Sequence, residues 1–184
     1  MAHEAQVFLR QLLSKPKQIS AIAPSSPWLA KAMAQGLEPN SGRVVEFGPG
    51  TGALTRGILA AGVAPADITL FEMSPDFVAH LRQTLPGVTI HSAAAQLAPN
   101  LVPKGVARVI SGLPLLSMPS GLRHAIVKAG FDILAPDGVF SQFTYGPNLP
   151  ISSDVMADLG LSLRKGPKVW LNLPPARVYH FYRA

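Results

Sequence analysis

A short apolar run followed at once by closely spaced glycines constrains the fold of this chain more than any other feature. The run VVEF, residues 44–47, has the character of a buried strand, and Gly48, Gly50 and Gly52 follow it directly. Apolar side chains at helical spacing follow over residues 54–59. Glycine turns tightly and leaves no Cβ between the backbone and a ligand. The stretch therefore predicts a strand, a glycine turn and a helix whose first amide groups face a nucleotide-like cofactor.

Two cofactors fit this turn. GPGTGA, residues 48–53, satisfies the dinucleotide pattern G-x-G-x-x-G/A, and Glu72 follows about twenty residues later. Glu46, just before the turn, and the tighter spacing to Gly52 favour S-adenosylmethionine instead. In this form the stretch resembles motif I of class I methyltransferases, although glycines that serve packing alone are an alternative.

The resemblance to motif I implies a set of cofactor contacts. In such proteins the turn contacts the methionine part of S-adenosylmethionine, and the acid in the position of Glu72 accepts hydrogen bonds from both ribose hydroxyls. The family often has an acid or Asn for the adenine after the third strand, where this chain has His91 and Ser92. The expected contacts are Glu46, Gly48, Pro49, Gly50, Thr51, Gly52, Glu72, Met73, Ser92 and Ala93.

Composition limits the partners that the chain can have. Its 184 residues suit one domain, and 48% of them are hydrophobic while only 14% are charged. The formal net charge of +6 favours an acidic partner, either nucleic acid or an anionic membrane. The chain has no cysteine, which excludes disulfides, thiolate metal sites and a cysteine nucleophile. No metal is expected.

The first residues predict a short amphipathic helix over residues 5–14. Pro16 limits this helix, and basic residues border its apolar face, which suits a helix lying at a membrane interface or one docked on its own domain. Glu4 interrupts any secretory pattern, so we expect a cytoplasmic protein that associates peripherally with the inner face of the membrane. The membrane-binding candidates are Phe8, Leu9, Arg10, Leu12, Leu13, Lys15 and Lys17.

A second helix is expected from Pro27 to Met33, capped by Ser25 or Ser26 and stopped by Gly36. The segment before it, residues 19–26, suits either a lid over the cofactor or a plain connector. We therefore divide the chain into an N-terminal membrane-binding and lid segment, residues 1–36, and a methyltransferase domain, residues 37–184.

The rest of the chain alternates strands and helices, which predicts an α/β fold. The expected fold is a single-domain, Rossmann-like class I methyltransferase, with a mostly parallel, seven-stranded sheet that ends in an antiparallel hairpin. Strands are expected over residues 44–47, 68–71, 88–90, 106–111 and 139–145, and two more lie within residues 168–183 on both sides of a turn at 173–175. Helices are expected over 75–85, 122–134 and 154–159, and a turn at 136–138.

The loop after the fourth strand, residues 111–115, is the expected reaction centre. Ligands of doubly wound sheets gather at the carboxyl ends of the strands. The loop stands where amine methyltransferases have N-P-P-Y or N-L-P-Y; Leu113 and Pro114 match, whereas Ser111 and Gly112 depart from that motif. A plain proline turn is the alternative. The catalytic candidates are Ser111, Gly112, Leu113, Pro114, Tyr145, Tyr179 and His180.

Over nearly its whole length the chain resembles the bacterial phospholipid N-methyltransferases. The resemblance rests on KPKQISAIAPSSPWLAKAMA, VVEFGPGTGALT, SGLPLLSMP and LNLPPARVYHFYR. It implies methyl transfer from S-adenosylmethionine, leaving S-adenosylhomocysteine, to phosphatidylethanolamine on the way to phosphatidylcholine, at an anionic membrane surface and without nucleic acid. The substrate-binding candidates are Arg177, Lys168 and Trp170.

Two other functions remain open on the sequence. Ribosomal RNA adenine dimethyltransferases share E-x-G-P-G-x-G-x-L-T and a Leu-Pro pair, but Gly112 and Leu115 replace the Asn and the aromatic residue that flank their pair. In a non-catalytic module that only binds the cofactor, the loop at residues 111–115 would take no part in catalysis. Oligomeric state and the number of methylation steps are not predicted.

Overall fold

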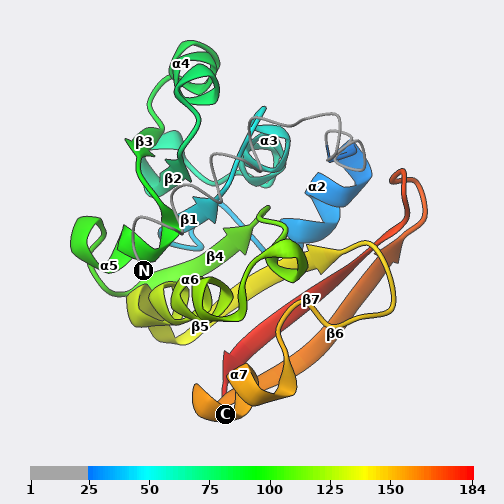
Figure 1. Ribbon diagram of the computed structural model, residues 1–184. Coiled ribbons are helices and arrows are strands. Elements are labelled where there is room, and N and C mark those ends of the chain that lie inside the picture. The colour runs from blue at the N-terminus through cyan, green and yellow to red at the C-terminus, as the bar shows by residue number, and fades with distance from the viewer. Residues whose placement is uncertain (1–24) are drawn as a thin grey trace.

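The computed structural model describes residues 25–184, which form a twisted sheet with helices on both faces (Figure 1). The seven strands run in the order β3-β2-β1-β4-β5-β7-β6. Neighbouring strands from β3 to β5 pair in parallel, and β7 pairs antiparallel with both β5 and β6. The predicted fold class is confirmed.

The elements follow the order expected from the sequence. The strands are β1 (Val44–Phe47), β2 (Ile68–Glu72), β3 (Thr89–Ser92), β4 (Val106–Ser111), β5 (Leu134–Thr144), β6 (Leu161–Val169) and β7 (Ala176–Arg183). The helices are α2 (Pro27–Met33), α3 (Ala53–Ala60), α4 (Pro75–Thr84), α5 (Ala98–Leu101), α6 (Ser120–Ile133) and α7 (Ser153–Asp158), with short 3₁₀ turns at Pro65–Asp67, Ala95–Leu97 and Leu115–Ser117.

Alternating strand residues give the sheet two buried faces. Val44 of β1 packs with residues of α2, α3 and α4, whereas Phe47 packs with α5, α6 and α7. Phe47 sits edge-on to Phe71 and Phe140, with ring centroids 5.7 and 6.4 Å away. Both faces of the central strands are thus covered, which leaves the strand ends as the place for a ligand.

Helix α2 belongs to this core. Ser26 caps it by accepting the amide proton of Leu29 at 3.2 Å, as expected, and both Leu29 and Met33 are fully buried. The membrane-binding candidates between Phe8 and Lys17 lie outside the described residues. The division at residue 36 stays a prediction, with α2 packed against α3 in one core. No helix within residues 25–184 combines the length and hydropathy needed to cross a bilayer.

The last hairpin differs from the expectation at its first strand. We expected that strand to start near Lys168, but β6 begins at Leu161 and contains Gly166 and Pro167. The pairing register with β7 shifts between Lys165 and Lys168. Because β6 lies at the edge of the sheet, a proline there need not remove a ladder hydrogen bond.

The expected turn at residues 136–138 also differs. It lies within the bounds of β5, where the pairing register with β4 shifts between Val106 and Arg108. The extra residues therefore bulge out of a continuing strand rather than separating α6 from it.

Candidate active site

The glycine turn leaves the first strand at its carboxyl end. The amide of Gly48 donates to the carbonyl of Phe71 at 3.0 Å, and the amide of Gly52 donates to the carbonyl of Pro49 at 2.8 Å. A Cβ added at Gly50 would meet no atom within 4 Å, and its φ of +54° suits glycine. At Gly52, in contrast, an added Cβ would lie 3.0 Å from Leu81 of α4. Gly50 thus faces open space, while Gly52 serves close packing.

Glu72 ends β2 directly beside this turn and is only 4% exposed. Its Oε2 accepts the amide of Gly50 at 3.0 Å, and its Oε1 accepts the amides of Met73 and Ser74 at 2.8 Å each. A carboxylate has about four acceptor positions, so three are filled and one remains for a ligand hydroxyl. Accepting both hydroxyls of a ribose would require the Gly50 amide to move away.

Glu46 lies beneath the turn and is fully buried. Its Oε2 accepts the hydroxyl proton of Thr55 at 2.6 Å, whereas Oε1 has no partner within the described part of the chain. Burial raises the pKa of Glu46 from 4.5 to about 8; the Thr55 hydrogen bond and Arg56 oppose this, and Glu72 adds to it. The site therefore holds an unpaired carboxyl oxygen beside the expected donor pocket.

The loop after β4, residues 111–115, packs directly on the glycine turn. The amide of Gly112 donates to the carbonyl of Phe47 at 2.8 Å. A Cβ added at Gly112 would lie only 2.7 Å from the carbonyl oxygen of Gly48, and one at Gly48 would lie 2.5 Å from Leu113. Glycine at position 112, a departure from the amine methyltransferase motif, is thus what permits the two loops to touch.

A glutamine that the sequence did not single out holds this loop. Gln142 on β5 is 1% exposed, and its Nε2 donates to the carbonyls of Leu113 and Phe143, each at 3.0 Å. Its Oε1 is buried without a partner among residues 25–184. Ser111 is also fully buried, and its Oγ accepts the amide of Leu113 at 3.4 Å. The sequence indicates Gln142 only weakly, because a polar residue inside a strand usually means only that one face of the sheet is exposed to solvent.

The three other catalytic candidates are distributed over both faces of the sheet. Tyr179 is 2% exposed and packs in the core beneath α6 and α7. His180 points to the opposite face, 3.0 Å from the hydroxyl of Ser141. Burial, with Arg108 and Arg164 assisting, lowers the His180 pKa from 6.5 to about 4, which leaves the ring neutral. Burial also raises the Tyr145 pKa, with Asn172 opposing.

The residues expected near the adenine and those expected near the lipid lie at the ends of strands and on the final hairpin. Ser92 is exposed and pairs with Glu72 across the strands, while His91 lies over Phe71 with ring centroids 5.1 Å apart. Arg177 donates to the carbonyl of Gly166 at 3.3 Å. Lys168 places its Nζ 3.7 Å from the ring centroid of Trp170. The substrate-binding candidates therefore gather on the final hairpin.

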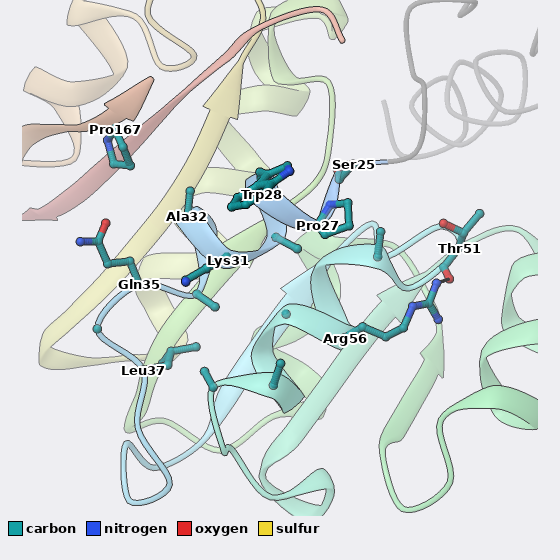
Figure 2. A pocket seen from close by; sticks show the side chains of 17 residues that line it. Ser25, Pro27, Trp28, Lys31, Ala32, Gln35, Leu37, Thr51, Arg56 and Pro167 are labelled. Carbon is teal, nitrogen blue, oxygen red and sulfur yellow. Dashed lines mark hydrogen bonds between the residues drawn. The ribbon is translucent and has the colours of Figure 1, made fainter. Parts of the chain in front are cut away.

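A separate groove of about 1050 Å³ lies between α2 and α3 (Figure 2). Trp28 and Lys31 of α2 line one side, and Thr51 and Arg56 line the end near the glycine turn. Small side chains, including Ala53 of α3, make up much of the rest. Neither Glu72 nor the loop at residues 111–115 lines this groove, so it is not the donor pocket.

No metal cluster is formed in the part of the chain that the structure describes: no three His, Asp or Glu side chains converge within residues 25–184.

Comparison with known proteins identifies the chain's relatives. No protein-family model matches it. It is similar to an ornithine lipid N-methyltransferase of Singulisphaera acidiphila, with 31% identity over 150 residues, which cover 77% of this chain and 78% of the relative. The expectation of a lipid N-methyltransferase is confirmed at the level of the family.

Solved structures share the fold. A TehB-like SAM-dependent methyltransferase of Corynebacterium glutamicum aligns over the full length of both chains, with a TM-score of 0.66 and 12% identity. TrmN of Thermus thermophilus has a TM-score of 0.66 and 18% identity over 86% of this chain, which spans 49% of that protein. SAM-bound CalS10 of Micromonospora echinaspora has a TM-score of 0.58 and 16% identity, and the match covers 83% and 88% of the two chains. The chain therefore belongs to the family of the ornithine lipid N-methyltransferase and has the Rossmann-like fold of class I S-adenosylmethionine-dependent methyltransferases.

Proposed function

We propose that this protein transfers a methyl group from S-adenosylmethionine to the amine of a membrane lipid, with phosphatidylethanolamine and its methylated forms as acceptors. The observation that carries this proposal is the direct contact between the glycine turn and the loop at residues 111–115. Gly112 and Gly48 approach so closely that no side chain fits between them. A donor on the turn and an amine on the loop would then be neighbours.

Three features of the turn fit S-adenosylmethionine. Open space at Gly50 lets a ligand lie against the backbone. Glu72 keeps one acceptor position for a ribose hydroxyl while three amides hold its carboxylate in place. The unpaired Oε1 of Glu46 offers a hydrogen-bonding position to the methionine end. S-adenosylmethionine supplies the chemistry as an electrophilic methyl group on a sulfonium.

The chain's own task is to position the amine and to keep water away. The nitrogen lone pair forms the new bond to carbon, the sulfur keeps the electron pair of the bond that breaks, and the nitrogen loses a proton. Gln142 fixes the carbonyl of Leu113, which sets the direction of the loop. Holding the reacting atoms near their attack geometry lowers the activation free energy, by about 7–11 kcal/mol in favourable cases.

The loop itself supplies the groups that orient the amine. A pKa of about 4 makes His180 a weak base, and the raised pKa of Tyr145 keeps its phenol protonated. A protonated phenol at Tyr145 serves as a hydrogen-bond donor rather than as a base. Backbone carbonyls of the loop and the Ser111 hydroxyl remain to accept hydrogen bonds from the amine, whose proton is released to solvent.

Peripheral attachment is part of the proposal. The amphipathic segment at residues 5–14, outside the described residues, would carry the enzyme to the cytoplasmic face of an anionic membrane. Its apolar side chains and flanking basic residues support this role.

The relative's substrate gives a second candidate acceptor. An ornithine head group, like phosphatidylethanolamine, offers an amine near an anionic group, so Arg177 and Lys168 suit either lipid. Vesicles of each lipid should be incubated with methyl-labelled cofactor, and the extracted lipids analysed. Label on phosphatidylethanolamine supports the main proposal, label on the ornithine lipid alone moves the assignment to that lipid, and label on neither contradicts both.

A further inference from the structure

The tip of the β6–β7 hairpin, residues 170–175, displays large apolar side chains to solvent. Trp170 is 69% exposed, Leu171 66% and Leu173 82%. Apolar groups that gather on a surface, rather than being scattered singly, commonly mark an interaction site. The hairpin tip is therefore a candidate interaction site.

The backbone beneath these side chains is anchored. Asn172, which stands between the two leucines, is only 3% exposed. Its Oδ1 accepts the amide of Ser26 at 2.9 Å, and its Nδ2 donates to the carbonyl of Pro174 at 2.8 Å. The tip is thus fastened to the start of α2, and the apolar side chains point outward from a fixed turn.

The charge around the tip has one sign. Residues 161–184 contain five of the 16 lysines and arginines in the chain and none of its 10 acidic residues. Lys168 holds its ammonium over the Trp170 ring, at 3.7 Å from the centroid. Tryptophan is enriched where hydrocarbon meets head groups, and lysines near an anionic leaflet are attracted to it. This combination fits a lipid surface.

The tip also lies at the same edge of the sheet as the reaction centre, where the parallel strands have their carboxyl ends. Ser111 of β4 and Tyr179 of β7 both pair with Gln142 of β5, so the three residues form one row across the sheet. The tip begins beyond Ala176, which lies three residues from Tyr179 towards the carboxyl end of β5. At about 3.3 Å per residue, the tip starts about 10 Å beyond the row that contains Ser111. Figure 1 shows the orange and red hairpin extending past the end of β5, beside α2.

We infer that the hairpin tip inserts Trp170, Leu171 and Leu173 into the head-group region of an anionic membrane. The inference rests on the proposed function in one respect, because a lipid acceptor requires the active site to face the bilayer. The tip then sets that orientation, independently of the residues before 25. A second copy of the chain is a poorer occupant, since three side chains cover far less than a standard interface and the two basic hairpins would repel.

Tryptophan fluorescence tests this directly, because the chain has only two tryptophans. In the full-length Trp28→Phe protein, Trp170 is the sole emitter. We expect its emission to shift to the blue on mixed phosphatidylcholine and phosphatidylglycerol vesicles, and to be quenched when the phosphatidylcholine carries bromine on its acyl chains. Unchanged Trp170 emission on vesicles that bind the protein would overturn the inference.

A leucine pair gives the matched comparison. Leu171→Ser with Leu173→Ser should reduce vesicle partitioning by about tenfold or more. The control is Leu101→Ser on α5, a side chain that is 44% exposed but distant from the tip, and it should leave partitioning unchanged. If the Leu171→Ser, Leu173→Ser variant and Leu101→Ser partition equally onto vesicles, the tip does not insert into the membrane. These vesicles contain no acceptor lipid, so insertion is measured independently of methylation. Quenching of Trp170 on them, together with no label on phosphatidylethanolamine or on the ornithine lipid in the separate methylation assay, would refute the proposed function alone.

Discussion

At the level of single residues, side-chain carboxyl and amide groups fix the two loops of the site through hydrogen bonds to their backbone. Glu72 is buried and already accepts three amides. Its role as a cofactor contact is predicted from its distance to the glycine turn and stays a prediction. The amide network around it was not predictable, because such bonds depend on the direction in which two loops leave neighbouring strands. Gln142 was missed for the same reason.

Glu72→Ala should weaken binding of S-adenosylmethionine by at least tenfold. A hydrogen bond to a charged group contributes about 1.5–3 kcal/mol, and the substitution also releases the amide of Gly50. Isothermal calorimetry measures the change, with Asp76→Ala, an exposed acid in the first turn of α4, as the matched control. Affinity within about twofold of the parent would remove Glu72 from the donor site.

Gln142→Leu should lower turnover while the donor affinity stays close to that of the parent. The leucine fills similar space but frees the carbonyl of Leu113, and small misplacement of a reacting group costs about a hundredfold in rate. The kcat for lipid methylation and the Kd for the donor are measured side by side. Thr144→Val, farther along the same strand, should change neither quantity. A parallel loss of donor affinity in Gln142→Leu would place its role in the donor pocket.

At the scale of elements, periodicity predicted the parallel core well and the edge of the sheet poorly. The strand β1 is fully buried, and β2 and β4 contain no exposed residue, so their apolar residues mark them clearly. The edge strand β6 alternates only weakly and contains glycine and proline, which an edge tolerates and a central strand does not. Its first residues therefore looked like a loop.

The element that the sequence assigns to membrane attachment is the segment at residues 5–14. Deleting residues 1–14 should greatly reduce sedimentation with anionic vesicles, because four apolar side chains and the neighbouring charge of Arg10 are lost. Donor affinity, measured by calorimetry, should stay nearly unchanged. Loss of donor binding would instead assign the segment to the core or to a lid, and undiminished sedimentation would leave the hairpin tip as the main membrane contact.

At the scale of the whole molecule, two buried groups couple stability to pH in opposite directions. Glu46 has a pKa raised to about 8, so between 4.5 and 8 the folded state binds more protons than the unfolded state. Stability contributed by this group is present at low pH and is lost as the pH rises through that window. His180, with a pKa lowered to about 4, is neutral when folded, so its contribution is lost as the pH falls from 6.5 towards 4.

Glu46 can be isolated above about pH 7.5, one unit beyond the ordinary histidine pKa, where His180 is neutral in both the folded and the unfolded state. Between about pH 7.5 and about pH 8.5 the free energy of unfolding of the ligand-free protein should fall, and Glu46→Gln should make this fall smaller. Urea denaturation at the two pH values measures the difference. His180→Gln, as the comparison, should retain the slope of the parent in this range. An unchanged slope in Glu46→Gln would show that the buried carboxyl titrates near its ordinary pKa.

A membrane lipid, and not RNA, should receive the methyl group at the loop beside the glycine turn. The most direct measurement offers the full-length protein methyl-labelled S-adenosylmethionine together with phosphatidylethanolamine vesicles and ribosomal RNA in one reaction, and separates the two acceptors afterwards. We expect label in the lipid amine, and about a hundredfold less label with Gln142→Leu. Label in the RNA fraction, with none in the lipid, would contradict it.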